Sequence, residues 1–136
     1  MLVTLSLFIL SEAGGAEESK SRTVHYVRVT NQLGNGIDLQ LHCKSRNDDL
    51  GIHVLSNQQF FQWHFRNNVW GTTRFYCYLF SKSWNNSFDV YYQGMCGAHC
   101  NWFVRQNGTC LETQEPYRSF CYPWPKGERE GLKLKD

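Results

Sequence analysis

The stretch IDLQLHCKSRNDDLG, Ile37 to Gly51, joins a strand pattern to a polar turn. Its apolar residues occupy every second position at first: Ile37, Leu39, Leu41 and Cys43. Because side chains along a strand point alternately to the two faces of a sheet, this spacing predicts a half-buried strand with Cys43 facing the core. The short polar side chains of Asn47, Asp48 and Asp49 then favour a turn, from which Gly51 can exit with positive φ. We therefore interpret Cys43 as a disulfide anchor and Arg46 to Asp49 as an exposed loop.

Other segments continue the strand pattern. Residues 24–30 are β-branched and aromatic, and the glycine-rich QLGNGI after them predicts that the first two strands form a hairpin or lie side by side. Alternation in four further segments predicts these inward side chains: Phe61, Trp63, Phe65, Phe75, Cys77, Leu79, Phe88, Val90, Tyr92, Cys100, Trp102 and Val104. Asn107-Gly108 predicts a two-residue type I′ turn that pairs residues 101–106 with 109–113. About seven to eight short strands without a helical stripe predict an all-β, antiparallel β-sandwich.

The chain carries signs of secretion. Met1 to Leu10 is an uncharged apolar run followed by small residues, so residues 1–16 are interpreted as a signal peptide. Residues 17–23 are assigned to a linker, 24–113 to the sandwich domain and 114–136 to a C-terminal extension, partly disordered. The even number of cysteines predicts a disulfide framework whose pairing stays open: Cys43, Cys77, Cys96, Cys100, Cys110 and Cys121. Asn85 and Asn107 begin glycosylation sequons, and we predict that they carry glycans.

Composition excludes some classes of function. The formal net charge is only +2, and no run of lysine or arginine occurs, so a nucleic-acid partner is not expected. Cys96, His99 and Cys100 could bind zinc, but no second pair of ligands has the usual spacing. His25, His42 and His64 fall on the polar positions of their strands, and no group of residues forms a catalytic pattern. We therefore predict no enzyme, no metal site and no cofactor.

An ordered set of motifs resembles one family, the plant self-incompatibility protein S1 family. The motifs, between Val24 and Leu111, are Val29-Thr30-Asn31, Leu41-His42-Cys43-Lys44-Ser45, Asp48-Asp49-Leu50-Gly51, Phe75-Tyr76-Cys77, Phe88-Asp89-Val90-Tyr91, Cys100-Asn101-Trp102 and Gly108-Thr109-Cys110-Leu111. The resemblance implies a secreted, disulfide-bonded β-sandwich without known catalytic activity. In its best understood members, such a protein is a ligand for a membrane receptor on incompatible pollen. This chain departs from the family in its longer C-terminal segment with Cys121, so whether Cys96 and Cys121 pair is open.

The resulting hypothesis is a secreted, extracellular, monomeric ligand in cell–cell recognition. Its expected partner is a cell-surface membrane receptor protein, without direct insertion of the chain into the membrane. Binding is assigned to three loops whose residues are Arg46, Asn47, Asp48, Asp49, Asn67, Asn68, Trp70, Lys82, Trp84 and Asn86. The alternative is a carbohydrate-binding or defence protein that uses Trp70 or Trp84, whereas Trp63 and Trp102 are expected in the core.

Overall fold

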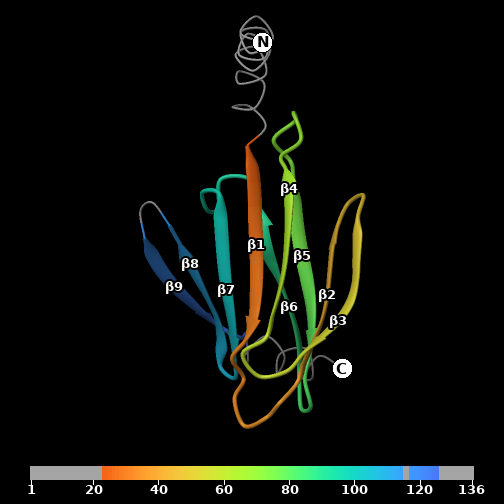
Figure 1. The fold of residues 1–136 in the computed structure, drawn as a ribbon, viewed down its shortest axis with the longest axis vertical. Helices are drawn as coiled ribbons and strands as arrows, with labels where there is room; N and C mark the ends of the chain where they lie inside the picture. Colours follow the sequence, from red (N-terminus) through yellow and green to blue (C-terminus); the bar gives the residue numbers. More distant parts are fainter. Residues whose placement is uncertain (1–22, 115–116, 126–136) are drawn as a thin grey trace, which may run out of the picture.

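A computed structural model describes residues 23–114 and 117–125, which form nine β-strands and no helix (Figure 1). The strands are β1 (Val24–Asn31), β2 (Leu39–Ser45), β3 (Asp49–Leu55), β4 (Phe60–Arg66), β5 (Arg74–Phe80), β6 (Asn85–Tyr92), β7 (His99–Arg105), β8 (Gly108–Thr113) and β9 (Arg118–Pro123). The all-β fold is thus confirmed, with β3 and β9 as strands that the sequence pattern did not reveal. Without a helix, this part of the chain also lacks a helical membrane span.

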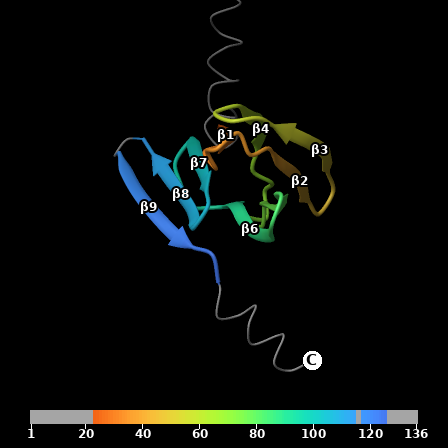
Figure 2. The same cartoon turned by 90° about the horizontal axis from the view of Figure 1, so that it is seen from below.

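The strands form two sheets, ordered β4-β1-β7-β8-β9 and β3-β2-β5-β6. Neighbouring strands are antiparallel, as predicted, except β1 and β7, which pair in parallel. Seen from below, β8 and β9 extend away from the other strands, and β6 lies across from them (Figure 2). β6 is an edge strand of its sheet and faces the side on which the β8–β9 hairpin lies.

The core lies between the sheets and confirms most of the predicted alternation. Leu39, Leu41 and Cys43 are fully buried, and the polar residues between them are not. Every predicted inward residue from Phe61 to Val104 is buried or packed against the core, with the exception of Tyr92. Trp63 and Trp102 are core residues, as expected. Burying this continuous apolar layer is the main contribution to folding.

Tyr92 is exposed, and Tyr91 is buried in its place. The ladder between β5 and β6 pairs Phe75 with Tyr91 but Tyr76 with Asp89, so Val90 is an extra residue in β6. A β-bulge of this kind shifts the alternation by one position, which a period-two pattern cannot anticipate.

The predicted pairing of the first two strands is wrong, because β1 and β2 belong to different sheets. The turn itself is present, since Gly34, Asn35 and Gly36 all have positive φ. The buried Asn31 directs the crossover: its amide nitrogen donates to the carbonyls of Ile37 and Leu55, at 2.9 Å each. Its amide oxygen accepts the backbone N–H of Leu33 at 2.8 Å.

The hairpin of β7 and β8 is confirmed, but its turn residues are not those expected. Arg105 pairs with Gly108, so Gln106 and Asn107 form the turn. Neither Asn107 nor Gly108 is among the described residues with positive φ, so the type I′ prediction is wrong. Gly108 instead allows a close approach of strands, because a Cβ there would collide with the carbonyl oxygen of Tyr122 on β9.

The sheet continues beyond residue 113, the predicted end of the sandwich domain. β9 pairs with β8 along its whole length, and the buried Trp124 follows it. The Trp124 indole N–H donates to the Arg105 carbonyl at 3.0 Å, which fixes the end of β9 to the β7–β8 turn. The predicted signal peptide, most of the linker and residues 126–136 lie outside the described residues.

Three disulfides join the six cysteines. Cys43–Cys77 links β2 to β5 within the core, and Cys110–Cys121 links β8 to β9. The third joins Cys96 to Cys100, so Cys96 and Cys121 are not partners. Because disulfide sulfurs are not thiolate ligands, the pairing of Cys96 with Cys100 favours the disulfide interpretation over zinc at these residues.

Candidate functional site

Two of the three predicted loops meet at one end of the sandwich. The β2–β3 turn and the β4–β5 loop border a groove of 780 Å³, whose lining includes Arg46, Asp48, Asn68, Trp70 and Arg74. We call this region the two-loop end: residues 45–48 and 67–71 with the groove between them. Its size is within the range of ligand and side-chain pockets, so it can receive a protruding part of a partner.

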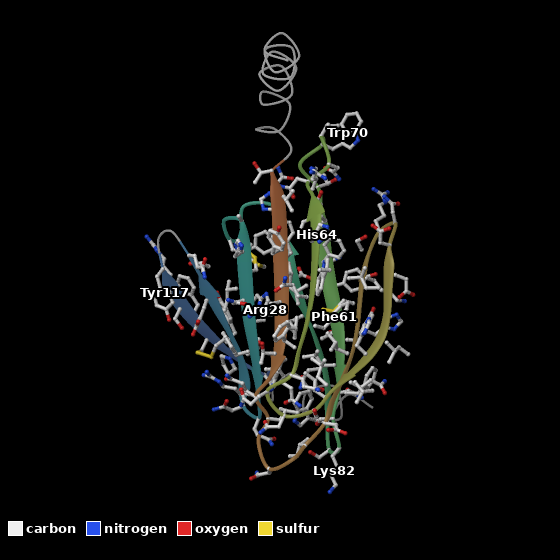
Figure 3. The ribbon with its side chains drawn as sticks, viewed as in Figure 1. Arg28, Phe61, His64, Trp70, Lys82 and Tyr117 are labelled. Atoms are coloured by element: carbon white, nitrogen blue, oxygen red, sulfur yellow. A yellow bond between two sulfur atoms is a disulfide. The ribbon has the colours of Figure 1, made fainter. Side chains whose placement is uncertain are left out.

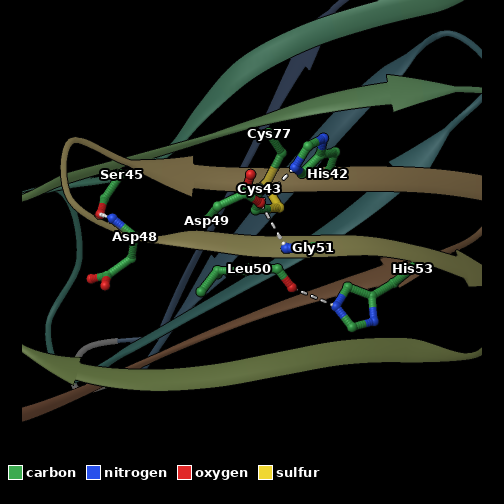
Figure 4. Close-up of polar contacts among 9 residues, drawn as sticks. All are labelled: His42, Cys43, Ser45, Asp48, Asp49, Leu50, Gly51, His53 and Cys77. Carbon is green, nitrogen blue, oxygen red and sulfur yellow. Dashed lines mark hydrogen bonds and ion pairs between the residues drawn. A yellow bond between two sulfur atoms is a disulfide. The ribbon is translucent and has the colours of Figure 1, made fainter.

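The β2–β3 turn is held by its own polar side chains (Figure 4). The Ser45 N–H donates to the Asp48 carbonyl at 2.7 Å, and the Asp48 N–H donates to Ser45 Oγ at 3.1 Å. Asp49, which begins β3, accepts the Gly51 N–H at 2.9 Å, while Gly51 has the predicted positive φ of 83°. Arg46, Asn47 and Asp48 are exposed at the tip of a turn that is already ordered.

Asp49 also bonds to a histidine. Its Oδ1 lies 2.6 Å from Nε2 of His42 on the neighbouring strand. The Gly51 N–H, and after it the His42 hydrogen bond, lowers the pKa of Asp49 below its usual 3.8. Neither His42 nor Asp49 lines the groove, so this pair links the start of β3 to β2 and lies outside the two-loop end.

Asn68 organises the β4–β5 loop through four hydrogen bonds. Its Oδ1 accepts the N–H groups of Trp70 and Thr72, at 3.1 Å each. Its Nδ2 donates to Thr72 Oγ1 at 3.0 Å, and its own N–H donates to Thr73 Oγ1 at 2.7 Å. The loop so fixed leaves Val69 88% and Trp70 81% exposed, with Trp70 at the tip of the molecule (Figure 3). A large apolar pair is thus presented to solvent on an ordered support.

Asn67 faces inward and connects the loop to the core. Its Nδ2 donates to Nε2 of His25 at 3.0 Å, and its Oδ1 accepts the Tyr91 hydroxyl at 2.8 Å. Nδ1 of His25 lies 3.2 Å from the Gly97 carbonyl, so His25, which falls on a polar position of its strand, is a half-buried link between the loop and the β6–β7 connection. Burial raises the pKa of the Tyr91 hydroxyl, against a smaller lowering by Asn67. Asn67 therefore positions the loop rather than offering its amide to a partner.

The groove also contains charged side chains. Arg74 donates through Nε and Nη2 to Oδ1 of Asp89, at 3.0 and 2.7 Å, and lies over the ring of Tyr76 at 4.8 Å. The Asp89 hydrogen bonds raise the pKa of Arg74, so its charge is constant at any physiological pH. Arg46 and Asp48 add one charge of each sign from the opposite wall. A polar rim around an exposed tryptophan is the usual anatomy of a protein-binding surface.

The third predicted loop lies elsewhere. Lys82 is at the opposite end of the molecule from Trp70 (Figure 3), where Trp84 packs against Trp124 with ring centroids 5.3 Å apart. Trp84 is half-buried against the core, and Asn86 already belongs to β6 with its amide nitrogen buried. Trp84 therefore packs against the core, and the structure does not bring this loop together with the other two.

The predicted glycosylation sites are both exposed: Asn85 begins β6, and Asn107 lies in the β7–β8 turn. The fold therefore leaves both side chains accessible to an oligosaccharide, and their modification stays a prediction. Neither asparagine lines the groove of the two-loop end.

Comparisons with known proteins agree with this architecture. The family described as plant self-incompatibility protein S1 matches residues 26–124. S-protein homolog 3 of Arabidopsis thaliana is 34% identical over 110 residues, covering 75% of this chain and 73% of that protein. S-protein homolog 5 is 38% identical over 102 residues, covering 72% and 76%, and S-protein homolog 19 is 34% identical over 129 residues, covering 91% and 89%, both from the same plant.

A solved structure has the same fold. It is described as one of the SPH (Self-Incompatibility Protein Homologue) proteins, a widespread family of small, highly stable, secreted proteins from plants. The TM-score is 0.57 at 18% identity, over 76% of this chain and 96% of that one.

Proposed function

The chain belongs to the plant self-incompatibility protein S1 family, and from that membership we propose that it is a secreted recognition ligand for a protein on the surface of plant cells. The two-loop end binds the partner, and the rest of the sandwich holds that end rigid. Secretion accords with the description of the structural relative and with a domain that contains three disulfides. The role is binding without catalysis, and whether the partner reports pollen compatibility or another signal depends on where the chain is expressed.

The exposed Val69–Trp70 pair is the observation that carries this proposal. Val69 and Trp70 are the two most exposed large apolar side chains of the described residues and lie side by side in the chain, and Asn68 holds the backbone of their loop by hydrogen bonds. An ordered loop loses less conformational entropy on binding than a mobile one, so more of the contact energy appears as affinity. Tryptophan is also the residue type most often found as an energetic centre of protein interfaces.

The test is saturable binding of the fluorescently labelled chain to intact plant cells, including pollen. We expect binding to disappear when residues 46–48 and 68–71 are both replaced by Gly/Ser segments, and to persist when residues 82–83 are replaced. Brief protease treatment of the cells should also abolish binding, because the partner is a protein. Unchanged binding by the correctly folded double-loop variant would refute the site.

Carbohydrate binding is a second candidate, favoured by the exposed indole of Trp70 beside the groove that Asn47 and Asn68 line. Saturable binding to a glycan array that is lost in Trp70→Ala, together with cell binding that resists protease, would favour this alternative over a receptor protein.

A further inference from the structure

A second groove, of 440 Å³, lies between β6 and the β8–β9 hairpin and shares no lining residue with the groove of the two-loop end. Three consecutive residues of β6 border it: Ser87, Phe88 and Asp89. Successive side chains of a strand point to opposite faces, so three in a row can border one groove only along the edge of the strand. The groove therefore runs beside the backbone of β6.

This edge of β6 is not covered by another strand, since β6 ends the order β3-β2-β5-β6 of the described residues. The Ser81 N–H donates to the Trp84 carbonyl and closes the β5–β6 turn. From that turn onward, hydrogen-bonded and non-hydrogen-bonded residue pairs alternate along the antiparallel ladder. The backbone N–H and C=O groups of Asn86 and Phe88 therefore bond to β5. Ser87 and Asp89 therefore direct their N–H and C=O groups into the groove, two residues apart, as a neighbouring strand requires.

The opposite wall is apolar. It consists of Leu111 on β8 with Phe120 and Tyr122 on β9, of which the two aromatic residues remain 41% and 49% exposed. The buried Trp102 lies beneath, and its indole N–H is satisfied by the Val90 carbonyl at 2.8 Å. Among the described residues, no lysine, arginine or histidine lines the groove, and the single carboxylate, Asp89, is bonded to Arg74. The groove thus matches an uncharged apolar surface on its occupant.

We propose that this groove binds an extended peptide segment of another protein, which adds to β6 as a further strand. The peptide pairs with the backbone of Ser87 and Asp89, and its inward side chains, uncharged and apolar, contact Phe120 and Tyr122. Donors and acceptors at strand spacing beside an apolar wall are the two features of recognition by strand addition. A small apolar molecule would leave the backbone groups of Ser87 and Asp89 without partners. The bulge at Val90 ends the pairing edge, because the Val90 carbonyl is already used by Trp102.

The experiment titrates the full chain with the capped peptide acetyl-Thr-Val-Thr-Val-Thr-amide and follows backbone amide resonances. We expect chemical-shift changes at Ser87, Asp89 and the β8–β9 hairpin, and slower hydrogen exchange of the Ser87 and Asp89 amides. The same peptide N-methylated at its three central residues keeps its side chains but loses the three backbone N–H donors of those residues. It should bind at least tenfold more weakly, and equal binding would overturn the proposal.

Matched variants of the protein separate pairing from folding. Ser87→Pro removes an N–H that points away from β5, so the β5–β6 ladder is kept and peptide binding is lost. Ser87→Ala keeps the N–H and should bind like the parent chain. If Ser87→Pro does not fold, Tyr122→Ser is the second variant. It should bind the peptide at least fivefold more weakly, whereas the control Tyr117→Ser should bind the peptide as the parent chain does.

Two further outcomes are informative. Trp70→Ala should leave peptide binding unchanged, because the two-loop end is separate from this groove. Dimerisation of the free chain through β6, detected by sedimentation together with protected Ser87 and Asp89 amides, would show that a second copy is the occupant and would overturn the proposal. Shift changes confined to other surfaces would do the same.

Discussion

Gly108 shows how one missing side chain permits a whole strand to pair. A Cβ at this position would meet the Tyr122 carbonyl oxygen and lie 2.8 Å from Cα of Pro123, so β9 would have to move. We expect Gly108→Ala to lower the free energy of unfolding by about 1 to 3 kcal/mol, the usual effect of forced overpacking. Urea unfolding measures this effect.

Gly97→Ala is the matched control, because a Cβ there would have its nearest neighbour at 3.8 Å, an ordinary contact. It should change stability by less than about 0.5 kcal/mol. Equal effects of the two substitutions would contradict the close approach of β8 and β9.

The Asp49 carboxylate makes stability depend on pH. Its pKa is lowered in the folded protein, first by the Gly51 N–H and then by His42. The ionised form is therefore favoured by folding, so its contribution is present above the usual pKa of 3.8 and is lost as pH falls through the lower folded value. Between about pH 4 and pH 2, Asp49→Asn should lose less stability than the parent chain. Urea midpoints across this range test the prediction, and identical slopes would contradict it.

The sequence predicted single residues well where local chemistry decides them. Cys43 and Gly51 have the predicted roles because each depends on a few neighbours in the chain. Asn67 and His25 were misassigned because their partners are distant in sequence, so no local pattern could identify them. Trp84 was misplaced for the same reason: its packing partner, Trp124, follows forty residues later.

At the scale of elements, the β4–β5 loop depends on Asn68. Asn68→Ala removes the three hydrogen bonds made by the side chain, so residues 69–71 should become more mobile while the sandwich is hardly affected. We expect lower backbone order parameters at Val69 and Trp70, and roughly tenfold weaker binding to the cell-surface partner. The melting temperature should fall by only a few degrees, since the loop is exposed. Unchanged order parameters would show that other contacts hold the loop.

The strands themselves were predictable because alternation reports burial directly. Their arrangement was not, because pairing depends on contacts between distant segments. The buried Asn31 sends the chain from one sheet to the other, although the turn after it has the composition of a hairpin. β3 and β9 were missed although Ile52 and Val54 in β3, and Phe120 and Tyr122 in β9, occupy alternate positions. These apolar side chains are exposed, so alternation in the two strands does not report burial in the core.

At the scale of the molecule, the disulfides close loops of different length. Cys43–Cys77 spans 34 residues and Cys110–Cys121 spans 11. Loop entropy predicts that they stabilise the fold by about 3.8 and about 2.8 kcal/mol, respectively. Both cysteines of each bridge are replaced by alanine, and the free energy of unfolding is measured in urea. The Cys43/Cys77 double variant should lose more stability than the Cys110/Cys121 double variant. The reverse order would show that β9 contributes more to stability than its exposure suggests.

The molecule as a whole is a rigid support for two loops at one end, and its most direct test is the affinity of that end. We predict that Trp70→Ala weakens saturable binding of the chain to its plant cell surface by about 30-fold, or about 2 kcal/mol. The variant should unfold at the same temperature as the parent protein. Tyr117→Ala is the control: Tyr117 is 67% exposed but lies away from the two-loop end, so its affinity should be unchanged. Equal affinities of the parent, Trp70→Ala and Tyr117→Ala proteins would contradict the account.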